Sequence, residues 1–408
     1  MSRALVTTFL VVLLAAGCGD AAPAEPLAAS AGLERSAPNH EAPVSQLVVG
    51  FNQAGFDLWR RQPVAENLVF SPMSIGHALL MARGAADEAT GTAVDTALML
   101  PSGRGAHEAW NWIDQRWNAG TQDEPTLRIA DRIWPRRGLA PDQEWVDLLT
   151  AEHGVTIQPL DFAGDAAGSR ETINDWVSEQ TNELIPELLP EGFIDANTAL
   201  VLTDAVYFEA RWERVFGKYG PEPGEFTRLD DSKVTVDFMV GLEMGQFPHG
   251  RGERFDFIQL PYQGGQFSMS LIVPDEGQFA HVRSQLDQYI LDFIDENGRT
   301  GALELYVPRW ATTTSLDLMS WLRDIGAAPG SYPGISPDAF LDAAVHGADI
   351  VVDEQGTVAA AATGFGFPES GPPEPEMTIR ADRPFLYVIR DHGSGMVLFA
   401  GQVTDPSL

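Results

Sequence analysis

The sequence predicts a single α+β domain that follows a short leader and a tether. Helical patterns dominate the first third of the 408-residue chain, short β-prone runs dominate the rest, and no repeat or second linker divides them. With 44% hydrophobic residues, the chain can bury a large core. We place the leader at residues 1–17, the tether at 18–45 and the folded domain at 46–408.

The charge balance limits the kinds of partner. The chain has 58 acidic and 26 basic residues, for a net charge of −32. Such a surface repels polyanions, so we expect no nucleic acid, no heparin-like polyanion and no anionic lipid surface as a partner.

The leader has the pattern of a signal peptide. Arg3 precedes an apolar run at 4–16, which is too short to span a bilayer and ends in Leu-Ala-Ala-Gly-Cys. This end resembles a bacterial lipoprotein signal, in which Cys18 becomes the lipidated first residue. We therefore expect an exported protein, either lipid-anchored to a bacterial membrane and facing the periplasm or cell exterior, or extracellular. Cys18 is the only cysteine, so no intramolecular disulfide can form.

The tether and the leader are both expected to lie outside the fold. From Gly19 to about Ser45 the chain is rich in Ala, Pro, Ser and Glu and has no apolar period. This composition is typical of a disordered segment. The start of the chain, on this interpretation, contributes nothing to the core.

The first elements of the domain are helical. Apolar residues recur at helical spacing over 47–59, and a short strand at 67–70 leads into an apolar helix that begins at Pro72. Ser71 is placed to cap this helix. Ser74, Gly76 and His77 are interpreted as small or hydrogen-bonded core residues.

Strands dominate after residue 195. A helix is expected at 173–185, and the run 198–208 is apolar on both faces, as in a strand buried within a sheet, with Trp212 just beyond it. Further expected elements are strands at 234–239, 257–262, 267–274 and 303–307, a short helix at 315–325, and a hairpin of strands 385–389 and 396–399.

The stretch from Asp353 to Phe385 has an unusual composition. Glu354 and Gly356-Thr357 precede a run of very small residues, and a tract rich in Gly and Pro follows at 364–376. An extended segment with no bulky or charged side chain can enter between two existing strands without a steric or desolvation penalty. Composition alone favours a flexible surface loop.

Motifs of enzymes are missing from the sequence. We find no Gly-x-Ser-x-Gly elbow, no phosphate-binding loop, no His-Glu-x-x-His and no cysteine within the domain. Ser394 beside His392 is interpreted as turn chemistry. We therefore predict no catalytic residue, no cofactor and no metal.

Seven stretches of the domain form a recognisable set. They are Asn67-Leu-Val-Phe-Ser-Pro-Met-Ser, the segment 173–194, Leu200-Val-Leu-Thr-Asp-Ala-Val-Tyr-Phe with Trp212, Leu260-Pro-Tyr, Ala344-Val-His, Asp353-Glu-Gln-Gly-Thr, and Arg383-Pro-Phe-Leu-Tyr-Val-Ile-Arg-Asp with Leu398-Phe-Ala-Gly. In type and order these stretches resemble the serpins, a family of protease inhibitors, across residues 46–408.

The resemblance implies helices packed around three mainly antiparallel β-sheets, with an exposed reactive-centre loop at about 354–383. It also implies suicide inhibition by a monomer: a target protease forms an acyl-enzyme with the loop, which inserts as a new central strand and leaves a 1:1 covalent complex. The hinge would be Glu354, Gly356, Thr357, Ala359, Ala360, Ala361, Ala362 and Thr363, and the region of sheet opening Ser71, Ser74, Asp204, Trp212 and His346.

The family's spacing predicts the cleaved bond only approximately. Counting seventeen residues from Glu354 gives Ser370-Gly371, counting back from Pro384 gives Pro373-Glu374, and a register slip would select Phe367. No Arg or Lys lies at these positions, so an elastase-, chymotrypsin- or subtilisin-like target is expected rather than a trypsin-like one. A papain-like cysteine protease stays open.

One departure from the family matters for the sheet opening. Asp204 replaces the usual Asn, and we hypothesise that it contacts His346 and favours a charged imidazole. The alternative to an inhibitor is a non-inhibitory serpin that serves as a binding or carrier module. The small-residue hinge counts against that alternative.

Overall fold

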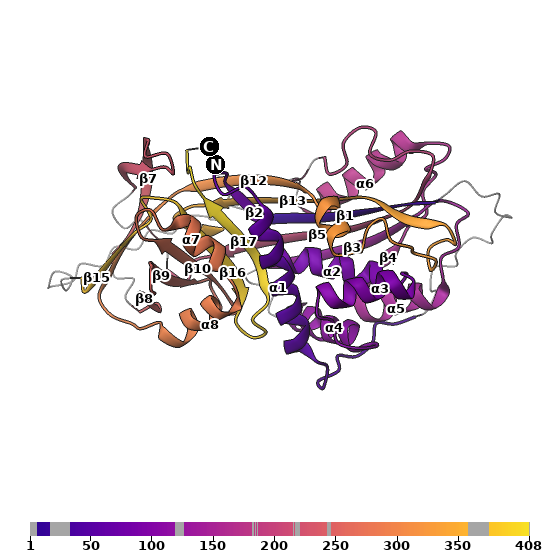
Figure 1. Cartoon of the computed structure of the whole chain (residues 1–408), viewed down its shortest axis with the longest axis horizontal. Helices are drawn as coiled ribbons and strands as arrows, with labels where there is room; N and C mark the ends of the chain where they lie inside the picture. The colour runs from indigo at the N-terminus through magenta and orange to yellow at the C-terminus, as the bar shows by residue number, and fades with distance from the viewer. Residues whose placement is uncertain are drawn as a thin grey trace.

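Among the residues that the structure describes, the strands form three β-sheets with helices packed around them, as the resemblance implied (Figure 1). The computed structural model describes residues 6–16, 33–118, 126–214 except 182, 184 and 186, 216, 221–242, 246–357 and 375–407. Within these residues the secondary structure forms one α+β domain.

The central sheet carries the functional region. Its strands follow the order β12 (Trp310–Asp317), β13 (Ala339–Val352), β1 (Val6–Ala16), β5 (Thr198–Arg211), β3 (Thr126–Pro135) and β4 (Thr156–Ile157), and the short β14 (Gly356–Thr357) also pairs with β5. All its pairs are antiparallel except β3 with β4.

The position of β1 corrects one expectation from the sequence. Residues 6–16, predicted to lie outside the fold, form a strand between β5 and β13, with Leu10 opposite both Asp204 and His346. The physical reason is that β5 and β13 each offer a row of backbone groups to a strand between them, and Val, Thr, Phe and Leu favour extended structure. The lipoprotein signal itself stays a prediction.

The second half of the predicted tether also belongs to the fold. The Ser36 amide donates to the Ala151 carbonyl at 2.8 Å, Arg35 lies 2.5 Å from Asp114, and the first described helix begins at Val44. These contacts with residues that are far away in the chain give no periodic signal in the sequence.

Most strands of the other two sheets lie at the left end of the molecule in Figure 1, away from the helices within residues 72–180. One follows the order β2 (Leu68–Phe70), β17 (Val397–Val403), β16 (Phe385–Asp391), β10 (Phe267–Pro274), β9 (Phe255–Pro261) and β8 (His249–Arg251). The other follows the order β15 (Met377–Arg380), β11 (Leu303–Pro308), β7 (Lys233–Leu242) and β6 (Glu222–Thr227).

Helices cover both faces of the central sheet. On one side lie α1 (Val44–Arg61), α2 (Pro72–Arg83), α3 (Glu88–Ala97), α4 (Gly105–Asn118) and α5 (Gln143–His153), and on the other α6 (Ala166–Gln180) (Figure 1). The remaining described helices are α7 (Phe279–Gln285), α8 (Gln288–Asn297) and α9 (Met319–Asp324). In the described part of the chain, no helix combines the length and hydrophobicity needed to cross a membrane.

Helix α2 begins where the sequence predicts and lies in the interior. Ser71 Oγ accepts a hydrogen bond from the Ser74 amide, and Pro72 occupies the first turn, where its missing N–H costs nothing. Residues 72–82 are all buried. The helix therefore lies directly beneath the central sheet, where it can supply polar groups to the strands.

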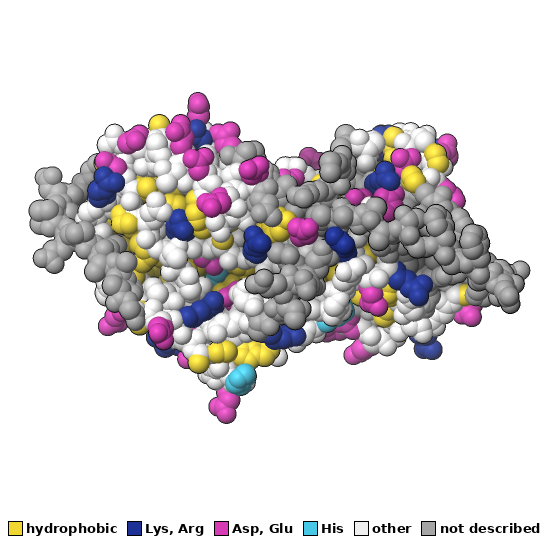
Figure 2. Space-filling model, turned by 180° about the vertical axis from the view of Figure 1, so that it is seen from behind, with side chains coloured by type: hydrophobic (Ala, Val, Ile, Leu, Met, Phe, Trp, Pro, Cys, Tyr) yellow, Lys and Arg dark blue, Asp and Glu magenta, His cyan; other side chains and the backbone are white. Residues whose placement is uncertain are grey.

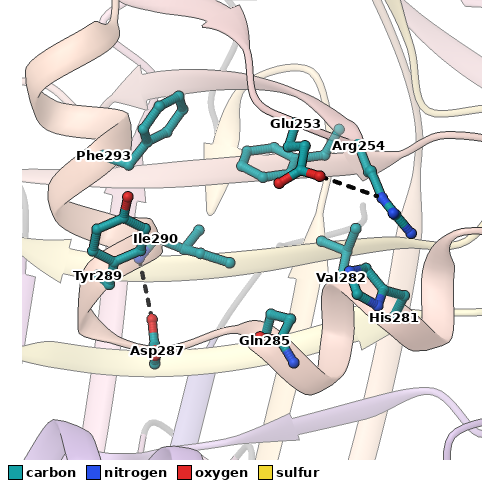
Figure 3. Close-up of a pocket in the computed structure, with 10 residues that line it drawn as sticks. Glu253, Arg254, His281, Val282, Gln285, Asp287, Tyr289, Ile290 and Phe293 are labelled. Atoms are coloured by element: carbon teal, nitrogen blue, oxygen red, sulfur yellow. Dashed lines mark hydrogen bonds and ion pairs between the residues drawn. The ribbon is translucent and has the colours of Figure 1, made fainter.

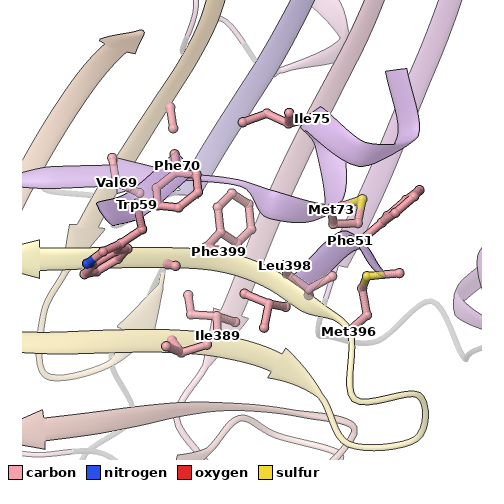
Figure 4. Close-up of a cluster of buried hydrophobic side chains, with 14 of the residues drawn as sticks. Phe51, Trp59, Val69, Phe70, Met73, Ile75, Ile389, Met396, Leu398 and Phe399 are labelled. Atoms are coloured by element: carbon pink, nitrogen blue, oxygen red, sulfur yellow. The ribbon is translucent and has the colours of Figure 1, made fainter. Parts of the chain in front are cut away.

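The core joins α1, β2 and α2 to the β16–β17 hairpin. Phe51 and Trp59 of α1 gather with Phe70, Met73 and Phe399, as the close-up in Figure 4 shows, and all five side chains are buried. This cluster fixes α2 against the hairpin, so α2 provides a rigid base for the sheet.

Two predicted elements have different bounds. The helix expected at 173–185 runs from 166 to 180, because Asp165 caps it by accepting from the Gly168 amide. The helix expected at 315–325 is wrong over its first turn: 315–317 belong to β12, where three threonines at 312–314 favour the strand, and α9 covers only 319–324.

Candidate functional site

The structure describes the base of the predicted hinge but not the loop beyond it. Glu354, Gly356 and the backbone of Thr357 are described, as is the whole predicted region of sheet opening. The other predicted site residues lie outside the described residues: Cys18, Ala359, Ala360, Ala361, Ala362, Thr363, Phe367, Ser370, Gly371 and Pro373.

A tight turn connects β13 to β14. The amide and carbonyl groups of Asp353 and Gly356 are joined by hydrogen bonds of 3.3 Å, and Gly356 has φ +127°. A Cβ at Gly356 would lie 2.5 Å from the Ala210 oxygen and 2.6 Å from the Trp212 nitrogen. The turn therefore depends on glycine, which alone adopts this conformation at low cost and permits such close approach.

The turn is fixed to the end of β5 and to the start of β12. The amides of Trp212 and Phe216 donate to the carbonyls of Gln355 and Glu354, at 3.0 and 2.8 Å. Arg309 Nη2 lies 2.6 Å from the Glu354 carboxylate, and this hydrogen bond raises the pKa of Arg309 above its usual value. The predicted first hinge residue is thus held by both neighbouring strands.

Strands β14 and β1 use the same edge of β5. In β14, Gly356 and Thr357 pair with Arg211 and Ala210 of β5. The pairing of β1 with β5 begins two residues further along, where Val6 lies opposite Phe208. On its other side β1 pairs with β13 over its whole length. We call the place between β5 and β13 the insertion position; its upper end borders the hinge and the rest is filled by β1.

Polar residues predicted for the sheet opening meet beneath the insertion position. Ser74 Oγ donates to Asp204 Oδ1 at 2.5 Å, and the Ser71 amide donates to His346 Nε2 at 3.0 Å. All four residues have no exposed surface. Helix α2 therefore contacts both β5 and β13 through hydrogen bonds, on either side of β1.

The hypothesised contact between Asp204 and His346 is wrong for this structure. The backbone of Leu10 lies between the two residues, and Asp204 Oδ2 instead lies 2.7 Å from His77 Nδ1. His346 Nε2 accepts a hydrogen bond and so carries no proton. His77 is therefore the partner of Asp204 in this structure, and the sequence did not predict it.

His77 begins a chain of hydrogen-bonded imidazoles. Its Nε2 lies 2.9 Å from His153 Nδ1, and His153 Nε2 lies 2.8 Å from His107 Nδ1. Burial, followed by the charges of Arg83 and Arg104, lowers the pKa of His107 to about 3. Burial likewise lowers the pKa of His153 well below its usual value. Because His77 follows Ser74 by three positions, helical spacing alone could have placed both on the face toward Asp204.

A second carboxylate completes this region. Asp131 of β3 is the direct cross-strand partner of Asp204, and its Oδ1 lies 3.7 Å from His77 Nδ1. Burial, and next the charge of Asp204, raises the pKa of Asp131 well above its usual value. Two acids opposite each other on a buried face are unfavourable unless a proton or a cation lies between them.

A surface pocket is lined by residues within 253–255 and 281–293, none of which belongs to the predicted region of sheet opening. It has a volume of about 330 Å³ and is lined by residues of α7, α8 and the β8–β9 turn (Figure 3). Tyr289 borders it and is 75% exposed. Asp287 caps α8 by accepting from the Ile290 amide, so this carboxylate is already engaged.

The surface carries charges of both signs. On the face seen in Figure 2, acidic and basic side chains are interspersed.

The fold and the site define a class of protein in which one strand of the central sheet, β1, lies between β5 and β13, directly below the turn that leads from β13 into β14. The model of the family described as "Serpin (serine protease inhibitor)" matches residues 50–406. The chain belongs to the serpin family, whose members are generally protease inhibitors rather than enzymes.

Relatives from distant organisms support this assignment. An uncharacterized serpin-like protein of Methanosarcina acetivorans is 30% identical over 84% of this chain and 82% of its own. The leukocyte elastase inhibitor of Sus scrofa is 28% identical over 89% of this chain and 100% of its own. The structure of human thyroxine-binding globulin has a TM-score of 0.78 at 22% identity and covers 89% of this chain and 99% of its own, which shows a shared fold.

Proposed function

We propose that this protein is an inhibitory serpin that traps a target endopeptidase by inserting its cleaved loop into the central sheet. The observation that carries the proposal is the register of β14. Gly356 and Thr357 already pair with the upper end of β5, directly above a position that accepts a whole further strand. Cleavage of the loop would free the hinge to continue along this edge.

The sequence of the hinge suits this path. Continuing β14 in register would bring Ala359 opposite Phe208 and Thr363 opposite Asp204, the residues that now face Val6 and Leu10. The side chains between them are alanines, which can pass between strands without obstruction. At ~1 kcal/mol net per hydrogen bond, a ladder on both sides makes insertion strongly favourable.

Energy for inhibition would come from a metastable native state. Once the leader that carries β1 has been removed, an uninserted loop leaves the edges of β5 and β13 that now pair with β1 without a partner strand. Insertion satisfies them, so the free form must be held by a kinetic barrier. The contacts of Glu354 with Arg309 and with the Phe216 amide hold the hinge base before cleavage. We infer that these contacts must break before the hinge can insert, and that they contribute to the kinetic barrier in this way.

The target is proposed to be a serine protease with a small or apolar specificity pocket. Ser370-Gly371 is the first candidate bond, with Phe367 and Pro373 as alternatives, and none of these residues is basic. An elastase-, chymotrypsin- or subtilisin-like enzyme fits, and a papain-like cysteine protease is a further candidate. The complex would be 1:1 and the free inhibitor a monomer.

Location is proposed from the leader alone. Lipidation of Cys18 after removal of residues 1–17 would tether the domain to a bacterial membrane through the part of the predicted tether that precedes Arg35, since Arg35 and Ser36 already bind the domain. The inhibitor would then face the periplasm or the cell exterior, where foreign or secreted proteases are met.

A carrier function is the second candidate. The pocket between α7 and α8 has about 330 Å³, within the range of small-molecule sites. Its lining includes Glu253, Arg254 and the exposed Tyr289, so it is open and partly charged. The hinge of small residues favours inhibition over this candidate.

The decisive experiment is incubation with an elastase, a chymotrypsin, a subtilisin, a trypsin and a papain, followed by a denaturing gel. A band at the summed mass that survives denaturation supports the proposal, and sequencing of the released C-terminal peptide identifies the bond. Thr357→Arg should convert the inhibitor into a substrate, because an Arg side chain hinders entry of the hinge.

Thr96→Arg, the same change on the exposed face of α3, serves as the control and should leave complex formation intact. Cleavage by several of these enzymes without any complex, and without a rise in heat stability after cleavage, would argue for the carrier.

A further inference from the structure

We propose that His77, Asp131 and Asp204 bind one divalent first-row transition-metal cation, such as Zn²⁺ or Mn²⁺, beneath the central sheet. These residues come from α2, β3 and β5, and each offers one ligand atom within 4.8 Å of the others. The site is independent of the proposed inhibition, and we call it the His77–Asp131–Asp204 cluster.

The spacing of the three ligand atoms fits a small cation. His77 Nδ1 lies 2.7 Å from Asp204 Oδ2 and 3.7 Å from Asp131 Oδ1. Ligands about 2.1 Å from a tetrahedral zinc ion are separated by roughly 3.4 Å. The observed distances lie on either side of this value, so rotations of the two carboxylates suffice to place a cation between them.

An unpartnered oxygen points to a ligand. The Asp131 side chain is only 7% exposed, so water has little access to it. Its Oδ1 is buried and has no hydrogen-bond partner within the described part of the chain. It faces His77 Nδ1, on the side toward Asp204. A buried carboxylate oxygen without a donor is costly, and a cation at this point would satisfy it.

The surroundings resemble the outer partners of protein metal sites. Ser74 Oγ donates to Asp204 Oδ1, which leaves Oδ2 for a cation. With Nδ1 as ligand, His77 carries its proton on Nε2 and donates it to His153 Nδ1, which in turn lets His153 donate to His107. Trp110 stacks on the His77 ring at 3.6 Å and fixes its plane. Metal-bound imidazoles are commonly oriented by such second hydrogen bonds.

The charges favour a divalent ion. Two carboxylates and one neutral imidazole balance a charge of +2. Arg35, a cation whose charge acts on Asp131, is itself paired with Asp114 at 2.5 Å. A mixed set of imidazole and carboxylate ligands suits zinc and manganese better than calcium, which prefers six or more oxygens.

A bound cation would connect two strands to the helix beneath them. Asp131 and Asp204 are direct cross-strand partners on β3 and β5, and His77 is fixed within the buried α2. The cation would therefore hold β5, one border of the insertion position, at a constant place over α2.

The test uses the full chain, stripped with a chelator, and Zn²⁺ and Mn²⁺ separately as probes. Because the ligand side chains are 0% to 7% exposed, exchange is slow and each probe is equilibrated overnight. We expect one cation per chain after gel filtration, measured by elemental analysis, and a rise in the melting temperature. Loss of the His77 Nδ1 proton signal in NMR spectra would accompany binding.

Asp131→Asn is the main variant, because it keeps the shape of the side chain and removes the negative charge, and the oxygen nearest His77, Oδ1, makes no hydrogen bond within the described residues. It should lower the affinity by at least about 100-fold, the upper end of the loss seen when only an outer partner of a metal ligand is changed. Circular dichroism verifies that it folds. His77→Gln, with the same expectation, is the second variant.

Asp175→Asn, at an exposed position on α6, controls for loose binding to this strongly acidic surface. Equal affinities of Asp131→Asn and Asp175→Asn, or no retained cation in the parent chain, would overturn the proposal and leave a proton shared by Asp131 and Asp204.

Discussion

The indole Nε1 of Trp212 donates a hydrogen bond of 3.0 Å to the carbonyl oxygen of Asp353. This contact joins the end of β5 to the first residue of the turn that leads into the hinge. Trp212 is itself held by stacking on Tyr262, with ring centroids 4.6 Å apart. The hinge therefore starts from a fixed point at the upper end of the insertion position.

Gly356→Ala should weaken this attachment. The added Cβ would meet backbone atoms of Ala210, Arg211 and Trp212 at 2.5–2.6 Å, and backbone cannot yield as a flexible side chain can. We expect the free energy of unfolding to fall by about 2 kcal/mol, as for strained backbone in general. Denaturant unfolding followed by tryptophan fluorescence measures this.

Gly265→Ala is the matched control, because Gly265 also has a positive φ, +67°, but its Cβ would meet nothing within 4 Å. It should cost about 1 kcal/mol, the price of a left-handed alanine alone. Equal losses for the two variants would show that the close approach at Gly356 contributes no strain.

The insertion position leads to a prediction about the leader. With residues 6–16 paired to β5 and β13, the hinge has no free edge below Ala210, so the full chain should form less covalent complex than a chain that starts at Gly19. The full chain should also melt at a higher temperature, since β1 completes the ladder. Cys18→Ser keeps the leader attached during expression.

Val11→Pro in the full chain provides the control. Proline removes a backbone donor in the middle of a strand that is paired on both sides, so β1 should leave the sheet and complex formation should recover. If the full chain and the shortened chain give the same yield of complex, β1 does not compete with the hinge.

The sequence predicts local features of this fold well and tertiary neighbours poorly. The start of α2 follows from Ser71 and Pro72, and β5 follows from a run that is apolar on both faces. By contrast, the 6–16 run has the composition of a signal peptide, and its pairing depends on edges of β5 and β13 that are far away in the chain. Residue type alone could not distinguish these two outcomes.

The same limit applies to the candidate sites. The seven family stretches led to Ser71, Ser74, Asp204, Trp212 and His346. In the structure, hydrogen bonds join Ser74 to Asp204 and Ser71 to His346 beneath β1, whereas Trp212 lies beyond the end of β5, against Asp353. A role of these residues in sheet opening stays a prediction. The partner of Asp204 was missed, because His77 was interpreted only as a hydrogen-bonded core residue, although its helical spacing from Ser74 places both side chains on one face of α2. Asp131 was missed because it faces Asp204 only through the register of β3 with β5.

Stability should fall in acid partly because of His107. Its pKa is lowered to about 3 in the folded protein, chiefly by burial, whereas an unfolded histidine titrates near its usual 6.5. Below pH 6.5 the unfolded chain therefore binds a proton that the native protein does not. The native state loses up to ~1.4 kcal/mol per pH unit from this residue down to about pH 3, and nothing above pH 6.5.

His107→Asn tests this, because the Asn amide can replace Nδ1 in the hydrogen bond to His153 and does not titrate. With a chelator present, unfolding free energies from pH 7 to pH 4 should show a shallower slope for His107→Asn than for the parent chain. His281→Asn, at an exposed histidine of α7, should keep the parent slope. Identical slopes for all three proteins would mean that the buried imidazole of His107 gains its proton without unfolding.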